Sequence, residues 1–155
     1  MARRPLPAEA LPGGPSGAVF VDTNVFLRYL TDDVPEQAAA AEKLFRQASA
    51  GTVQLVTNTM VIAELVWVME SYYRLARPET QQRALAVATM EGLDMPGVDV
   101  VVQALLDYVD KNVDFIDAYN AAWARHRAIE SIATFDATHL GRFDHLGVVI
   151  PGGRP

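Results

Sequence analysis

Short β-branched apolar runs recur along this chain and are separated by segments whose apolar residues follow helical spacing. The runs predict strands at 18–21, 53–57, 98–101, 131–135 and 147–150. Strands that alternate with helices form parallel sheets, because each helix carries the chain back to the same end of the sheet. The sequence therefore predicts an α/β fold, a three-layer α/β/α domain with a central, mostly parallel sheet of four to five strands.

The segments between the strands predict helices with recognisable ends. They are expected at 24–31, 35–50, 60–73, 78–91, 102–110 and 114–127, with a turn at 92–97 and a short helical or irregular piece at 138–143. Pro35 suits a first turn, and Gly51 suits the residue after a helix. Asp22 or Asn24 could cap the first helix, and we favour Asn24 for this role. The inward-facing residues of that first helix are expected to be Val25, Leu27, Tyr29 and Leu30.

Length and composition fit one folded domain. Half of the 155 residues are apolar, which is enough for a sizeable core. We divide the chain into a flexible Pro/Gly-rich arm over 1–17, a domain over 18–151 and a short tail over 152–155. The chain has no cysteine, which excludes disulfides and Cys-based zinc sites and fits a cytoplasmic location. No apolar run is long enough to span a bilayer, so no membrane partner is expected.

The formal net charge of −6 argues against a broad basic surface for nucleic acid. It does not exclude a nuclease, because bound divalent cations invert the local charge of an acidic site.

Several carboxylates occur where the predicted fold can bring them together. Asp22 and Asp136 each follow a predicted strand, and the carboxyl ends of parallel strands share one edge of a sheet. Glu64 lies in a strongly apolar helical segment, so we expect it to be partly buried and to need a metal or an arginine. Asp114 and Asp117 are three residues apart, which places both on one face of a helix's first turn.

Each of these residues also has an ordinary structural interpretation. Glu64 could pair with an arginine, and Asp136 could be a turn residue. Asp114 could cap its helix, with Asp117 as the second half of a capping box. We favour Asp117 as a ligand, with Asp114 as a cap or supporting residue, because Asp117 and Asn120 lie together beside the predicted core face.

Three or four carboxylates in one crevice would repel one another unless hard cations were bound between them. Oxygen ligands suit Mg²⁺ or Mn²⁺, and the natural reaction of such ions is phosphodiester hydrolysis. His126, His139 and His145 lack the paired spacing of a zinc site and are expected to be surface or core residues. The sequence contains no Gly-rich phosphate loop and no Gly-x-Ser-x-Gly elbow.

The acidic segments resemble the PIN-domain family, most closely the VapC-type ribonuclease toxins of bacterial type II toxin–antitoxin systems. The resemblance covers about 18–150 and rests on four motifs. These are Phe20-Val21-Asp22-Thr23-Asn24-Val25, Ala63-Glu64-Leu65, Asp114-Phe115-Ile116-Asp117-Ala118 and Ala133-Thr134-Phe135-Asp136. It implies a PIN-like nuclease domain over 18–151 that cleaves single-stranded RNA with Mg²⁺ or Mn²⁺.

By position, the resemblance implies an acidic catalytic quartet of Asp22, Glu64, Asp117 and Asp136. Asp22 and Asp117 would be the principal metal ligands. Glu64 and Asp136 would complete the metal shell or position the attacking water, with Asp114 as a further supporting carboxylate. The supporting polar residues are expected to be Thr23, Asn24, Asn120 and Thr134.

The resemblance also implies a homodimer and a small VapB-type antitoxin protein that inserts a segment into a groove beside the site. Candidates for lining this groove are Tyr29, Trp67, Tyr72, Tyr73 and the alanine-rich helix at 35–50. Two alternatives stay open. One is a catalytically silent RNA-binding or interaction module on the same scaffold. The other is a flap-type DNA nuclease, which usually needs larger insertions than this chain has.

Overall fold

The computed structural model describes residues 17–153 of the chain. Its elements, in order, are β1 (Val19–Phe20), α1 (Thr23–Thr31), α2 (Pro35–Ser49), β2 (Leu55–Val56), α3 (Thr59–Ser71), α4 (Arg77–Ala88), β3 (Leu93–Asp94), α5 (Val98–Asp110), α6 (Phe115–His126), β4 (Ser131–Ala133), α7 (Ala137–Leu140) and β5 (Gly147–Val149). The predicted arm over 1–17 lies outside these residues, apart from Gly17. No helix among those described is long and apolar enough to cross a membrane.

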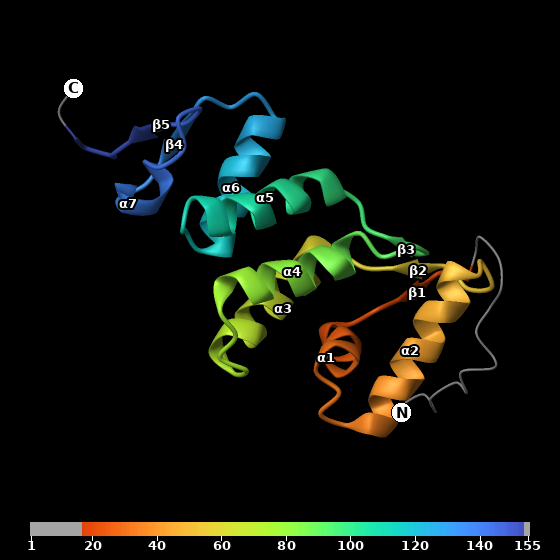
Figure 1. Cartoon of the computed structure of the whole chain (residues 1–155). Coiled ribbons are helices and arrows are strands. Elements are labelled where there is room, and N and C mark those ends of the chain that lie inside the picture. Colours follow the sequence, from red (N-terminus) through yellow and green to blue (C-terminus); the bar gives the residue numbers. More distant parts are fainter. Residues whose placement is uncertain (1–16, 154–155) are drawn as a thin grey trace, which may run out of the picture.

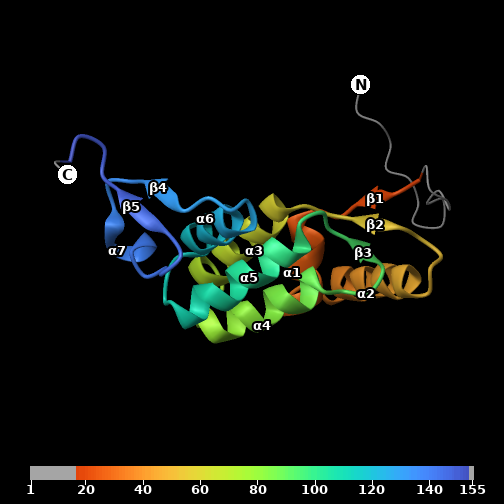
Figure 2. The same ribbon diagram turned by 90° about the horizontal axis from the view of Figure 1, so that it is seen from above.

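The five strands are parallel and divide between two sheets. One sheet has the order β1-β2-β3, and the other pairs β4 with β5. Figures 1 and 2 show the two sheets at opposite ends of the molecule, with the α3–α6 helices between them. The predicted α/β class with parallel strands is confirmed. The strands do not form one central sheet, because β1 and β4 do not pair with each other.

One hydrophobic core runs through both ends of the molecule. Phe26 of α1, Leu55 of β2 and Ile62 of α3 are fully buried at the end that carries β1. Leu140 at the end of α7 and Phe143 after it belong to the same buried cluster. The β4-α7-β5 unit (131–149) is therefore packed against the helices and shares their core.

The third strand lies where the sequence predicts a turn. The β-branched run Val98-Asp99-Val100-Val101 begins α5, so the strand predicted there is wrong, and Leu93–Asp94 pairs with β2 instead. Gly97 precedes α5 with φ +76°, a conformation that favours glycine and starts the helix at Val98. Residues of high strand propensity enter a helix here because Val100 and Val101 are buried on its inner face.

The first helix begins at Thr23, two residues before the start that a cap at Asn24 would give. Asp22, and not Asn24, occupies the N-cap position, and its side chain makes no capping hydrogen bond. Phe26 is the fully buried residue of α1, while Tyr29, predicted to face inward, is exposed. Thr23, Phe26 and Leu30 recur at helical spacing on the inner face of α1, and Tyr29 lies off that face.

Candidate active site

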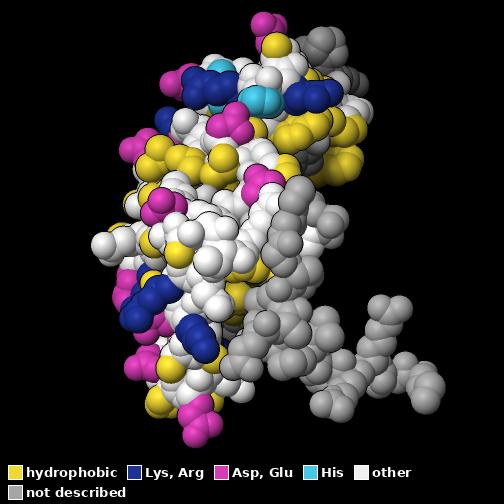
Figure 3. All heavy atoms as spheres, turned by 90° about the vertical axis from the view of Figure 1, so that its right-hand side faces the viewer, with side chains coloured by type: hydrophobic (Ala, Val, Ile, Leu, Met, Phe, Trp, Pro, Cys, Tyr) yellow, Lys and Arg dark blue, Asp and Glu magenta, His cyan; other side chains and the backbone are white. Residues whose placement is uncertain are grey.

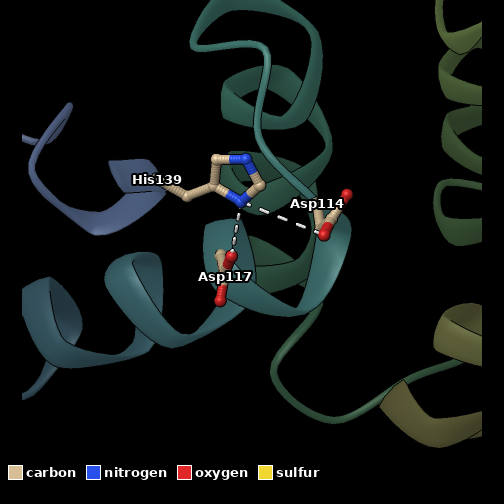
Figure 4. A group of neighbouring side chains, drawn as sticks. All are labelled: Asp114, Asp117 and His139. Carbon is tan, nitrogen blue, oxygen red and sulfur yellow. Dashed lines mark hydrogen bonds and ion pairs between the residues drawn. The ribbon is translucent and has the colours of Figure 1, made fainter. Parts of the chain in front are cut away.

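The start of α6 carries two carboxylates that meet a histidine from α7. The His139 Nδ1 atom lies 3.0 Å from Asp117 Oδ2 and 3.9 Å from Asp114 Oδ2. Figure 4 shows the imidazole pointing toward both carboxylates across the gap between the two helices. The potential ligand atoms of these three residues all lie within 4.8 Å of one another, and they form the only such group in the part of the chain that the structure describes.

Asp114 lies at the N-cap position of α6 but does not cap it through its side chain. Its carboxylate accepts a hydrogen bond from Arg77 Nη2 at 3.1 Å. The expectation that Asp114 caps the helix is thus correct for its position and wrong for its side-chain contact. Arg77 compensates part of the charge of Asp114, which leaves Asp117 as the better placed of the two for binding a cation.

Glu64 is exposed, so the prediction that it is partly buried is wrong. The buried face of α3 consists of Val61, Ile62, Leu65, Val66 and Met69, and Glu64 lies beside that face. Its partner is neither an arginine nor another carboxylate. The hydroxyl of the buried residue Thr23 donates to Glu64 Oε2 at 2.5 Å, which ties α3 to the first turn of α1 directly after Asp22.

Two neighbouring hollows connect Glu64 to Asp117. One, of about 480 Å³, is lined by Phe20, Asn58, Met60, Val61, Ala63, Glu64 and Trp67. The other, of about 330 Å³, is lined by Ala63, Val66, Trp67, Glu70, Asp114, Phe115, Ile116 and Asp117. Ala63 and Trp67 belong to both, so the hollows meet on the exposed side of α3. Together they form a mostly apolar groove with carboxylates at its edges.

The structure separates the predicted acidic quartet into two half-sites. Asp22 is exposed at the carboxyl end of β1, beside the Thr23–Glu64 pair. Asp136 is the exposed N-cap of α7, where it accepts a hydrogen bond from Thr138 N at 3.1 Å, three residues before His139. We name Asp22, Thr23 and Glu64 the β1 half-site, and Asp114, Asp117, Asp136 and His139 the α6 half-site.

The predicted supporting residues have different roles. Thr23 binds Glu64 as described, and the Thr134 hydroxyl accepts a hydrogen bond from Asp136 N at 3.0 Å. Asn24 on α1 and Asn120 on α6 are exposed. The residue that sequence reasoning missed is His139, which is 22 positions from Asp117. No local motif could indicate it, because the two residues meet only when α7 packs on α6.

Basic side chains form no continuous stripe on the face seen in Figure 3. Lysine and arginine appear there in separate groups, and hydrophobic side chains gather in bands among scattered acidic ones. This distribution agrees with the net charge of −6. A polyanion at the groove would therefore need cations, as a cluster of carboxylates also does.

Comparison with known families accounts for most of the chain. The PIN domain family model matches residues 19–146. The chain belongs to the PIN domain family. Members of this family are generally metal-dependent nucleases, which supports a nuclease role for this chain. A comparison with curated proteins finds no match.

The donor chemistry of this PIN domain fits a divalent cation. Carboxylate oxygens suit hard cations such as Mg²⁺ and Mn²⁺, and Asp114 and Asp117 supply them from adjacent positions on one helix face. The imidazole of His139 suits the role of an orienting partner, since ligating carboxylates are commonly hydrogen-bonded by a second group. Asp117 therefore combines accessibility with a partner that fixes its orientation.

Proposed function

We propose that the chain is a Mg²⁺- or Mn²⁺-dependent endoribonuclease that cleaves single-stranded RNA, and that it is the toxin of a VapBC-type pair. The observation that carries the proposal is the group formed by Asp114, Asp117 and His139 at the end of a groove in a PIN domain. The groove leads from this group to Glu64, another member of the expected quartet.

A single-stranded substrate is favoured by the aromatic side chain between the carboxylates. Trp67 lines both hollows and is 67% exposed. Exposed aromatic rings bind unpaired bases by stacking, at about 1–3 kcal/mol per base, whereas bases in a duplex are not available for this contact. A base on Trp67 would bring its phosphate toward the carboxylates at either edge of the groove.

Asp22 and Asp117 would hold the cation, with Glu64 and Asp136 as supporting carboxylates. The bound ion would supply Lewis-acid stabilisation of the phosphodiester. The residues of the chain would orient it: His139 fixes Asp117, and the Thr23 hydroxyl fixes Glu64. Each oriented carboxylate loses less freedom when the cation binds, which favours binding.

The test compares single-stranded RNA and DNA of the same sequence as substrates for the full chain, with Mn²⁺, with Mg²⁺ and with EDTA. We expect cleavage of RNA only, lost with EDTA and in Asp117→Asn and Asp22→Asn. Asp144→Asn serves as the matched control, because Asp144 is an exposed aspartate on the loop before β5. Equal RNA binding without cleavage by wild type and Asp117→Asn would instead support a silent binding module.

A toxin should also stop growth when it is expressed alone in bacteria, where it would act in the cytoplasm. Asp117→Asn should relieve the arrest, and Asp144→Asn should not. Co-expression of a small protein encoded next to this chain should relieve it too, if that protein is the antitoxin. Persistent toxicity of Asp117→Asn would contradict the proposed catalytic role.

A further inference from the structure

Two strand edges of this chain lack a partner among the described residues. β1 pairs only with β2, and β4 pairs only with β5. Val19 N and Val21 N donate toward β2, so the backbone groups of Phe20 point to the open side. Thr134 N donates to Val149 O on β5, so the groups of Ala133 and Phe135 point to the open side of β4. An unpaired edge readily accepts another strand.

Large apolar side chains surround both open edges. Next to β1, Phe20 is 52% exposed and Met60 is 73% exposed, and both line the groove. At the end of β4, Phe135 is 81% exposed. Exposed side chains of this size, clustered at open edges, indicate surfaces that are covered when the protein is fully assembled.

The open edge of β4 cannot reach the open edge of β1 of the same chain. Figures 1 and 2 place β1 and β4 at opposite ends of the molecule. The unit that contains β4 is also fixed to its own α6. His139 contacts Asp117, the His145 ring lies 3.1 Å from the Ala121 carbonyl, and Arg142 donates to the Asn112 carbonyl. A β4 strand that covers β1 therefore has to belong to a second copy of the chain.

We propose that two copies of this chain pair through these edges, with β4 of each copy added in parallel to β1 of the other. The two contacts are equivalent, so the dimer closes with two-fold symmetry and leaves neither edge open. In a parallel ladder, Phe20 N–H would donate to the Ala133 carbonyl, and Phe135 N–H would donate to the Phe20 carbonyl. This register places Phe20 opposite Thr134.

The same register joins the two half-sites. If Phe20 lies opposite Thr134, then Asp22 lies opposite Asp136, and both stand at the carboxyl ends of neighbouring parallel strands. Each complete site would contain the β1 half-site of one copy and the α6 half-site of the other, with Asp117, Asp136 and His139 arriving together. Strand exchange thus explains why the acidic residues are divided within a single chain, and it makes the proposed nuclease active only as a dimer.

Engineered cysteines test the strand exchange by an assay that does not depend on nuclease activity. The chain has no cysteine of its own, so only the introduced thiols can be cross-linked. A Phe20→Cys chain is mixed with a Thr134→Cys chain and treated with a short thiol cross-linker, and light scattering of the wild type gives its mass. We expect a dimer and efficient cross-linking between the two chains. Phe20→Cys mixed with Asp144→Cys is the control and should link poorly. A monomeric wild type, or linking only within a chain that carries both cysteines, would overturn the proposal.

Complementation gives a second test, which rests on the proposed nuclease function. Asp22→Asn and Asp136→Asn are each expected to be inactive. Refolded together, they should regain about a quarter of the wild-type rate per chain, because half of the dimers are mixed and each mixed dimer has one intact site of two. No regain, with an active wild type, would overturn the exchange. An inactive wild type that still cross-links between chains would overturn the nuclease function alone.

Discussion

Arg77, at the start of α4, holds the segment that leads into the α6 half-site. Its Nη1 atom donates to Val113 O at 2.9 Å and to Asn112 Oδ1 at 3.1 Å, and its Nη2 atom donates to Asp114 Oδ1 at 3.1 Å. Asn112 has φ +50°, a conformation that costs free energy for any residue with a Cβ atom. We expect Arg77→Met to release this strained segment while keeping the apolar stem of the side chain.

The expected loss of stability follows from the individual contacts. The two bonds to Val113 and Asn112 contribute about 1 kcal/mol each, the pairs with Asp114 and Glu70 about 0.5 kcal/mol each because they are partly exposed, and the contact with the Tyr108 ring about 0.5 kcal/mol. Since these contacts share one side chain and are not independent, we expect a loss of about 3 kcal/mol in the free energy of unfolding.

Urea unfolding followed by circular dichroism measures this loss. Arg46→Met is the matched control, because Arg46 pairs only with Glu42 in its own helix and its side chain is 76% exposed. The control should lose no more than about 0.5 kcal/mol. If Arg77→Met stayed within about 1 kcal/mol of Arg46→Met, the value of one hydrogen bond, the stabilising role given to Arg77 would be wrong.

Three further substitutions, two of them with a matched control variant, test other contacts by the same unfolding measurement. Gly92→Ala should lower the free energy of unfolding by about 3 kcal/mol, because Gly92 has φ +81° and an added Cβ would lie 2.4 Å from the Ala48 carbonyl. Gly51→Ala is its control: Gly51 has φ +76° but open space around it, so the loss should be about 1 kcal/mol. Equal losses in the two variants would contradict the effect of the close approach at Gly92. Thr23→Val should cost about 1.5–3 kcal/mol by removing the donor to Glu64, and Thr23→Ser should cost less; the reverse order would refute this. Burial raises the pKa of Tyr108, whose hydroxyl has no hydrogen-bond partner among the described residues. The wild type should therefore lose stability above its unfolded pKa of about 10, whereas Tyr108→Phe should match it or exceed it by about 1 kcal/mol at about pH 8 and show no such loss; parallel pH profiles would contradict this.

Most helices could be predicted because their signals are local. The apolar spacing in 35–50, with Pro35 at its start and Gly51 after its end, gives α2 within one residue. The run at 98–101 misled because β-branched residues suit either a strand or the buried face of a helix. What decides between them is Gly97 and the burial of Val100 and Val101, and burial is a property of the packed chain.

The candidate site could be predicted only in part, for a related reason. The sequence places Asp22 and Asp136 after strands, but they share a site only if β1 and β4 are neighbours in one sheet. The pattern of a strand does not specify its neighbour, since any open edge of suitable polarity can serve. His139 is a residue of the site that the sequence did not indicate. Its contact with Asp117 depends on the burial of Leu140 and Phe143 against the helices, and no sequence spacing encodes that packing. Local sequence patterns thus predict which residues can take part in catalysis. The pairing of two strand edges decides whether these residues share one site, which is what the proposed pairing of β1 with β4 of a second copy would bring about.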